Sequence, residues 1–187
     1  LDAEVVEAMK PFLTEVFGNP SSNHYFGIRA KKAVEHAREQ VASLFNCRGE
    51  ELIFTSGGTE SNNMAIWGLA FSLQQKGRHI ITSTIEHPAV SEVCDSLQEY
   101  GFEISRVGVD EYGLIRLDDL IKAIRPDTIL VSIMHANNEV GTIQPIREIS
   151  EICHGHGIVF HSDGAQSVGK IATDMNELGV DLYSLAG

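Results

Sequence analysis

The sequence predicts an α/β protein in which a mostly parallel β-sheet is covered by helices on both faces. Short apolar stretches alternate along the chain with amphipathic ones, as strands and helices do in such proteins. The apolar stretches are nearly continuous, which is typical of parallel strands buried on both faces. Polar residues also gather just after several of these stretches, where open parallel sheets bind their ligands.

The first 45 residues predict a helical segment, residues 1–45, that precedes the sheet. Residues 3–17 place apolar side chains about every four positions, which is the spacing of one helix face, and Pro11 could kink this helix. A loop with the sequence FGNPSSN follows. Residues 28–45 repeat the helical spacing and predict a second helix.

From residue 46 onward, strands and helices are expected to alternate within one larger domain, residues 46–187. The apolar runs predict strands, and apolar residues at intervals of three and four predict helices. The expected strands are residues 51–55, 79–83, 102–107, 128–134, 158–161 and 181–185. The expected helices are residues 59–75, 88–100, 117–124 and 146–153.

The composition is that of an ordinary globular protein and excludes several kinds of partner. Hydrophobic residues make up 43% of the chain and charged residues 21%, which is enough to form a core. A net charge of −12 argues against binding to nucleic acid or to an anionic membrane surface. The three cysteines form no CxxC pair and suit a reducing cytoplasm. No apolar stretch approaches the roughly 18 residues of a membrane span.

A glycine turn in the segment TSGGTESNN, residues 55–63, is a candidate phosphate site. Gly57 and Gly58 allow a sharp turn and close approach of a ligand, and the helix that follows offers free N–H groups. Thr59 adds a hydroxyl group. The segment is neither a Walker loop nor a dinucleotide-binding GxGxxG motif. The alternative is a capped helix start without a ligand.

Two further polar groups follow predicted strands. His87 lies between the strand at residues 79–83 and Pro88, where an imidazole can stack on a planar ring or move a proton. The alternative is a helix cap or a solvated residue. Asn137 and Asn138 could orient a polar ligand through their amides, although Asn pairs also commonly initiate turns.

Asp163 follows the apolar strand at residues 158–161. A desolvated carboxylate is costly without a cationic partner, and no Arg or Lys lies close in the sequence. A bound cofactor with a protonated ring nitrogen would supply that partner. The alternative is an N-cap, because Asp-Gly-Ala-Gln-Ser can start a helix.

The cysteine and histidines near residue 155 predict no metal site. Cys153, His154, His156 and His161 match no usual zinc spacing, and the glycines between them indicate a helix end.

The order of these groups is more specific than any one of them. A phosphate-type turn, a stacking imidazole, an amide and an Asp-x-x-Gln pair would match the parts of pyridoxal phosphate. In that assignment Asp163 pairs with the pyridinium nitrogen, and the ring serves as an electron sink for a substrate carbanion.

Five sequence blocks resemble the cysteine desulfurase and selenocysteine lyase family. This family belongs to the class V aminotransferase branch of fold-type I pyridoxal phosphate enzymes. The blocks are FGNPSS, TSGGTESNN, EHPAV, MHANNEVGTIQPI and HSDGAQSVGK, and they span most of the chain. The resemblance implies the large cofactor-binding domain of a cytoplasmic homodimer. The implied reaction takes sulfur or selenium from L-cysteine or selenocysteine, leaves alanine, and passes sulfur to an acceptor protein in iron–sulfur cluster assembly.

The resemblance also implies a role for each matching residue. Gly58 and Thr59 would hold the phosphate, and His87 would stack on the pyridine ring and move protons. Asn138 would lie near the ring and the substrate carboxylate. Asp163 would pair with the pyridinium nitrogen. Gln166 would donate to the phenolic oxygen of the ring.

Two departures from the family pattern set expectations for this chain. Ala186 stands where the family often has a phosphate-binding serine. The family's His-Lys pair, whose lysine forms the Schiff base, would come after Gly187, and Lys170 does not occupy that position. The cysteine that accepts sulfur would also lie further on, so Cys47, Cys94 and Cys153 are not assigned to it. We therefore expect an inactive fragment of a desulfurase. The alternatives are another class V aminotransferase or lyase, and a non-catalytic scaffold module.

Overall fold

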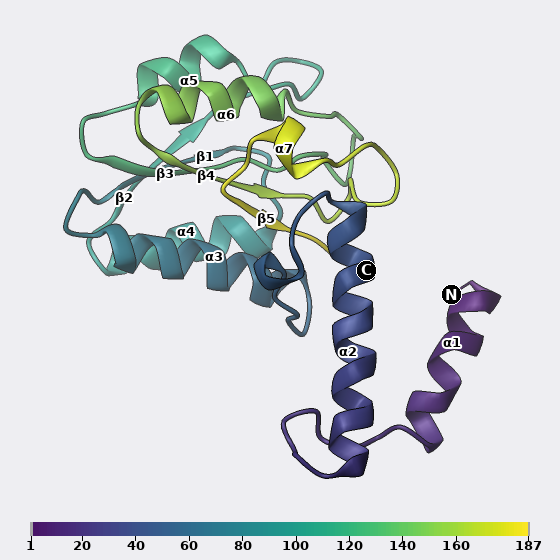
Figure 1. Cartoon of the computed structure of the whole chain (residues 1–187). Helices are drawn as coiled ribbons and strands as arrows, with labels where there is room; N and C mark the ends of the chain where they lie inside the picture. Colours follow the sequence, from purple (N-terminus) through teal and green to yellow (C-terminus); the bar gives the residue numbers. More distant parts are fainter. Residues whose placement is uncertain (1, 187) are drawn as a thin grey trace. The chain divides into compact units, whose positions relative to one another are not determined.

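The computed structural model describes residues 2–186 and divides the chain into two compact units, residues 1–53 and 54–187 (Figure 1). The first unit is helical and the second contains a β-sheet. The sequence predicted a boundary after residue 45, which stays a prediction. Residues 1 and 187, the outer limits of the two predicted domains, lie outside the described residues.

The first unit contains α1 (Ala3–Thr14), α2 (Tyr25–Leu44) and the short 3₁₀ helix η1 (Gly49–Glu51). The side chain of Asp2 caps α1 by accepting from the N–H of Glu4 at 2.8 Å, as a good N-cap residue does. His24 caps α2 through Nδ1, which accepts from the N–H of Gly27 at 3.3 Å. This cap explains why α2 begins three residues before the helix that the apolar spacing predicted.

The strand predicted at residues 51–55 is wrong. The Glu51 carboxylate accepts from the N–H of Arg48 at 2.8 Å and from its guanidinium at 3.0 Å at the start of η1. The N–H of Leu52 bonds to the carbonyl of Gly49 at 3.1 Å. Residues 52–55 then join no strand of the sheet described in residues 2–186. An apolar run becomes a strand only where another strand satisfies its backbone groups, and these residues have no such neighbour.

The second unit is built on one five-stranded sheet with the order β2-β1-β3-β4-β5, in which every pair is parallel. The predicted mostly parallel sheet is therefore confirmed. The strands are β1 (His79–Ser83), β2 (Glu103–Val107), β3 (Thr128–Ser132), β4 (Val159–Asp163) and β5 (Leu182–Ser184). β2 lies on one side of β1, and β3, β4 and β5 follow in order on the other side. The winding direction of the sheet therefore reverses between β1 and β3.

Helices cover both faces of the sheet, as the apolar strands predicted (Figure 1). One face packs against α3 (Gly58–Leu73) and α4 (Pro88–Glu99), and the other against α5 (Leu117–Ala123) and α6 (Ile146–Gly155). Neighbouring strand residues alternate between the two cores: Ile80 joins the first and Ile81 the second. This packing fixes the carboxyl ends of β1, β3 and β4 at one edge of the sheet.

A short helix, α7 (Met175–Leu178), was not predicted and precedes β5. The side chain of Asp174 caps it, and Gly179 ends it in the left-handed conformation. No helix within residues 2–186 has the length and apolar character needed to cross a membrane.

Candidate functional site

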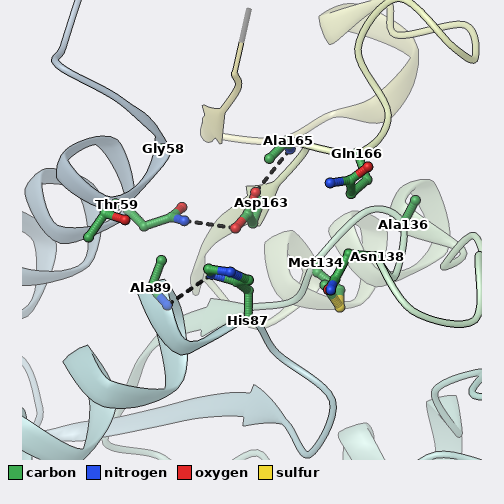
Figure 2. Close-up of a pocket in the computed structure, with 11 residues that line it drawn as sticks. Gly58, Thr59, His87, Ala89, Met134, Ala136, Asn138, Asp163, Ala165 and Gln166 are labelled. Atoms are coloured by element: carbon green, nitrogen blue, oxygen red, sulfur yellow. Dashed lines mark hydrogen bonds between the residues drawn. The ribbon is translucent and has the colours of Figure 1, made fainter.

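The pocket lies at the carboxyl ends of the strands, beside the point where the sheet reverses its winding. Such switch points are where open α/β sheets bind ligands, because the loops from two adjacent strands diverge there. The cavity measures about 220 Å³, somewhat below the size range of typical ligand pockets. All six predicted site residues line it: Gly58, Thr59, His87, Asn138, Asp163 and Gln166 (Figure 2).

The N-terminal turn of α3 presents uncapped N–H groups to the pocket. The N-cap residue is Gly57, so no side chain caps this end. Gly58 and Thr59 are the first helical residues, and both line the cavity. The positive end of the helix dipole therefore faces the pocket, which suits an anion.

The sequence predicted a sharp turn at Gly57 and Gly58, but the backbone there does not require glycine. Neither adopts a left-handed backbone, and a Cβ at Gly57 or Gly58 would meet no protein atom within 4 Å. No strand precedes them either, contrary to the sequence prediction. Open space around Gly58 thus leaves room for a ligand to approach the backbone.

His87 serves as the N-cap of α4 and also lines the pocket. Its Nδ1 accepts from the N–H of Ala89 at 3.1 Å, so the capping alternative considered from the sequence is present. Because Nδ1 acts as the acceptor, the proton of the neutral ring must lie on Nε2. The ring itself is exposed. His87 can therefore cap a helix through one nitrogen and handle a proton through the other.

Asn137 and Asn138, in the loop after β3, have different roles. Asn137 is buried, and its Oδ1 accepts from the N–H groups of Glu139 and Val140 at 2.9 and 3.0 Å. This is the turn chemistry considered as the alternative. Asn138 is exposed and lines the pocket. Only Asn138 is available to orient a ligand.

Asp163 ends β4 and is 6% exposed. Its Oδ2 accepts from the amide of Asn62 at 2.7 Å, and its Oδ1 accepts from the N–H of Ala165 at 3.0 Å (Figure 2). The chain after Asp163 forms turns rather than a helix, so the N-cap alternative is not present. No ion pair to Asp163 occurs within residues 2–186. This buried carboxylate thus has two neutral donors and can still accept from a cation.

Asn62 is a polar pocket residue that the sequence did not predict. It lies on α3, is 1% exposed, and lines the cavity beside Asp163. Its Oδ1 is buried without a hydrogen-bond partner in the described structure. A buried acceptor without a partner costs free energy. The hydrogen bond that the same amide donates to Asp163 holds it in this position. No local sequence pattern indicates this contact, because the two partners are 101 residues apart.

Gln166 and Gly164 complete this side of the pocket. The Oε1 of Gln166 accepts from Nζ of Lys170 at 2.7 Å, which leaves the Nε2 donors to face a ligand. A Cβ on Gly164 would lie 2.0 Å from Cζ of Tyr183. Only glycine therefore fits between Asp163 and the tyrosine ring.

Two buried titratable groups flank Asp163. Burial raises the pKa of the Glu86 carboxyl to about 7, and the charge of Asp163 adds to this, although bonds from Ser83 and Met134 oppose it. Burial lowers the pKa of His161 to about 4, and Asp163 opposes this shift only in part. The His161 ring bonds to Ser132 and Ser184 at 2.8 and 3.0 Å. At neutral pH His161 is therefore uncharged and cannot serve as the cation for Asp163.

The cysteines of the second unit are poor nucleophiles. Burial raises the pKa of both Cys94 and Cys153 to about 12. Cys47, in the first unit, also has a raised pKa, because of partial burial and the charge of Glu51. A reactive cysteine needs a lowered pKa, so none of the three is set up to accept sulfur.

Comparison with known proteins gives consistent matches. The model of the family described as Aminotransferase class-V matches residues 1–187. A cysteine desulfurase IscS of Dictyoglomus turgidum is 58% identical over 186 residues, which are 100% of this chain and 47% of that protein. A cysteine desulfurase IscS of Methanosarcina thermophila is 52% identical and covers 98% of this chain and 46% of that protein.

The solved structures agree with the sequence relatives. A structure titled "SspA in complex with cysteine" superposes with a TM-score of 0.96 at 41% identity, over 100% of this chain and 54% of that one. This match confirms the predicted fold class. The chain spans about half the length of the curated relatives that it matches.

Proposed function

Because this chain belongs to the aminotransferase class-V family, which uses pyridoxal phosphate, we propose that its pocket forms the cofactor-binding side of a cysteine desulfurase active site. The substrate of the whole protein is then L-cysteine or a close relative such as selenocysteine. Its sulfur passes to a thiol as a persulfide, and alanine is released. A homodimer and a sulfur-acceptor protein belong to the same proposal.

The residues of the pocket fit the chemical parts of this cofactor. The uncapped first turn of α3 and the Thr59 hydroxyl suit the phosphate dianion. The open space at Gly58 lets that anion reach the backbone N–H groups. Asp163 offers a buried carboxylate to a protonated ring nitrogen. When bound, the cofactor supplies an electron sink for the carbanion of the substrate.

The chain's own residues hold the ring and move protons. Asn62 and the N–H of Ala165 fix both oxygens of Asp163, so the carboxylate would meet a ring nitrogen without rearranging. His87 would lie against the bound ring and move protons through Nε2, since Nδ1 accepts from the N–H of Ala89. Gln166 would donate through Nε2 to the phenolic oxygen, and Asn138 would donate to a substrate carboxylate.

The observation that carries this proposal is the buried carboxylate of Asp163. It is held by two neutral donors in a pocket that the N-terminal turn of α3 also lines. A site with one fixed anion and one anion-binding helix end matches a ligand that carries a cationic nitrogen and a phosphate.

Product analysis with the full-length protein tests the proposal. L-cysteine should yield alanine and a persulfide, and Asp163→Asn should lower turnover by at least about 100-fold. Glu92→Gln, an exposed change on α4, should leave turnover unchanged. A 2-oxo acid as the product would assign the chain to another class V activity. Cofactor binding without any product from amino acids would favour a scaffold role.

A further inference from the structure

The backbone N–H of Met134 lies at a gap in the sheet. In a parallel sheet, alternate residues of a strand send their N–H groups to opposite neighbours. Ile133 and His135 donate to His161 and Asp163, which are residues of β4. The N–H of Met134 therefore faces β1, but β1 ends at Ser83 and its next residue bonds to β2 instead.

The side chain of Glu86 fills this gap. Its Oε1 accepts from the N–H of Met134 at 3.0 Å and from the hydroxyl of Ser83 at 2.5 Å. A carboxylate oxygen thus replaces the backbone carbonyl that a longer β1 would have offered. Glu86 immediately precedes His87, and Met134 lines the pocket, so this contact joins two of the pocket's walls.

A second contact strengthens the same junction. The Nδ2 of Asn137 donates to the carbonyl of Ile85 at 3.2 Å, and its Oδ1 organises the turn that carries Asn138. The loop with His87 and the loop with Asn138 are therefore held together by Glu86 and Asn137. Of these two residues, only Glu86 can change its charge.

Ionising the Glu86 carboxyl at this position costs free energy. Its Oε2 is buried and has no hydrogen-bond partner in the described structure. Within residues 2–186 it forms no ion pair with Lys or Arg. The titratable groups that act on it electrostatically are Asp163 of β4 and the Cys94 thiol of α4, and Asp163 repels its ionised form.

We propose that Glu86 is a positioning residue whose carboxyl group ties the His87 loop to the end of β3 and, by gaining or losing its own proton, sets how firmly these two pocket walls are held. An ionised carboxylate accepts a stronger hydrogen bond than a neutral one, but the raised pKa means that losing water around the charge costs more than these bonds return. Opening the junction lets water reach the carboxylate, so ionisation favours opening. The junction is therefore held more firmly when Glu86 is protonated and more loosely when it is ionised. The tie itself does not depend on the proposed function; only its effect on His87 as a proton carrier does.

Amide NMR of the full-length protein, labelled with ¹⁵N at methionine and free of cofactor and substrate, tests this directly. The amide proton of Met134 should move downfield with a single midpoint near pH 7 as the pH rises, because its acceptor becomes charged. Its protection from hydrogen exchange, corrected for the intrinsic rate, should decrease over the same range, because ionised Glu86 favours opening of the junction. Glu86→Gln keeps an acceptor oxygen but cannot ionise, so both changes should vanish.

Matched variants separate Glu86 from its neighbours. Glu92→Gln on α4 should leave the titration of Met134 intact, and His87→Asn should do the same if Glu86 is the titrating group. A Met134 signal that does not titrate, or that titrates unchanged in Glu86→Gln, would overturn the proposal. If the unmodified full-length protein has no desulfurase activity, that result would count against the proposed function alone, because the amide measurement needs no cofactor.

Discussion

The amide of Asn62 donates to Oδ2 of Asp163 across 2.7 Å and so fixes a buried carboxylate that lines the pocket. Asn62 comes from α3, whose first turn also lines the pocket, and Asp163 comes from the end of β4. The same helix therefore lines the pocket with its N-terminus and orients the carboxylate through Asn62. Under the proposed function, α3 would help to place both the phosphate and the ring nitrogen of the cofactor.

Replacing Asn62 by Ala should destabilise the chain by about 1–3 kcal/mol, because a buried carboxylate oxygen loses its donor. Urea unfolding measures this cost. Asn63→Ala is the matched control, since that amide bonds only to the carbonyl of Thr59 on its own helix. Equal stabilities of the two variants would contradict the role given to Asn62.

The two tasks of His87 can be separated by one substitution. Asn is among the best N-cap residues, so His87→Asn should keep the stability of α4 while the full-length protein loses about 10²- to 10⁴-fold in turnover. His87→Ala should lose turnover and also about 1 kcal/mol of stability. Unfolding and turnover measured on both variants would show whether cap and proton carrier are distinct.

Gly58→Ala tests whether the open space at α3 belongs to a ligand. The added Cβ meets no protein atom within 4 Å, so the free energy of unfolding should stay the same or rise slightly. Binding of pyridoxal phosphate to the full-length protein, followed by fluorescence, should weaken. Unchanged affinity would mean that no ligand approaches this backbone.

The free energy of unfolding should depend on pH through two buried groups, Glu86 and His161. The raised pKa of Glu86 means that the folded state binds the extra proton, so its contribution is present below about pH 4.5 and is lost as the pH rises through about 7. The lowered pKa of His161 acts in the opposite direction, since its contribution is present above about pH 6.5 and is lost as the pH falls towards 4. The two effects overlap and oppose each other between these limits.

Glu86→Gln removes one of these two opposing effects. As the pH rises from 4.5 to 7.5, the free energy of unfolding of the variant should increase by about 3 kcal/mol relative to that of the parent chain. Urea unfolding of both chains at several pH values measures the difference. A constant difference across this range would show that Glu86 does not carry a raised pKa.

Much of this fold follows from local patterns. The run His79–Ser83 is buried at every position and was predicted with the bounds that the structure has. The run at residues 51–55 has a similar composition but becomes no strand, because no neighbouring strand satisfies its backbone. The difference between these two segments lies in their surroundings, which a local pattern does not contain.

The pocket was predictable where each residue follows a strand or begins a helix. His87, Asn138 and Asp163 each stand at such a position, and the structure brings them into one cavity. Asn62 was not predicted and Glu86 was given no role, because the contacts of Asn62 with Asp163 and of Glu86 with Met134 join residues 101 and 48 positions apart. Their importance arises from the contacts of folding and from the loss of water around buried polar groups.

The protonation state of the cofactor ring is the most direct test of the account. Pyridoxal phosphate labelled with ¹⁵N in its ring can be bound to the full-length protein and observed by NMR. We expect a protonated ring nitrogen at pH values where the free ring is unprotonated, and loss of that proton in Asp163→Asn. An unprotonated nitrogen in the parent protein, or a signal that Asp163→Asn leaves unchanged, would contradict it.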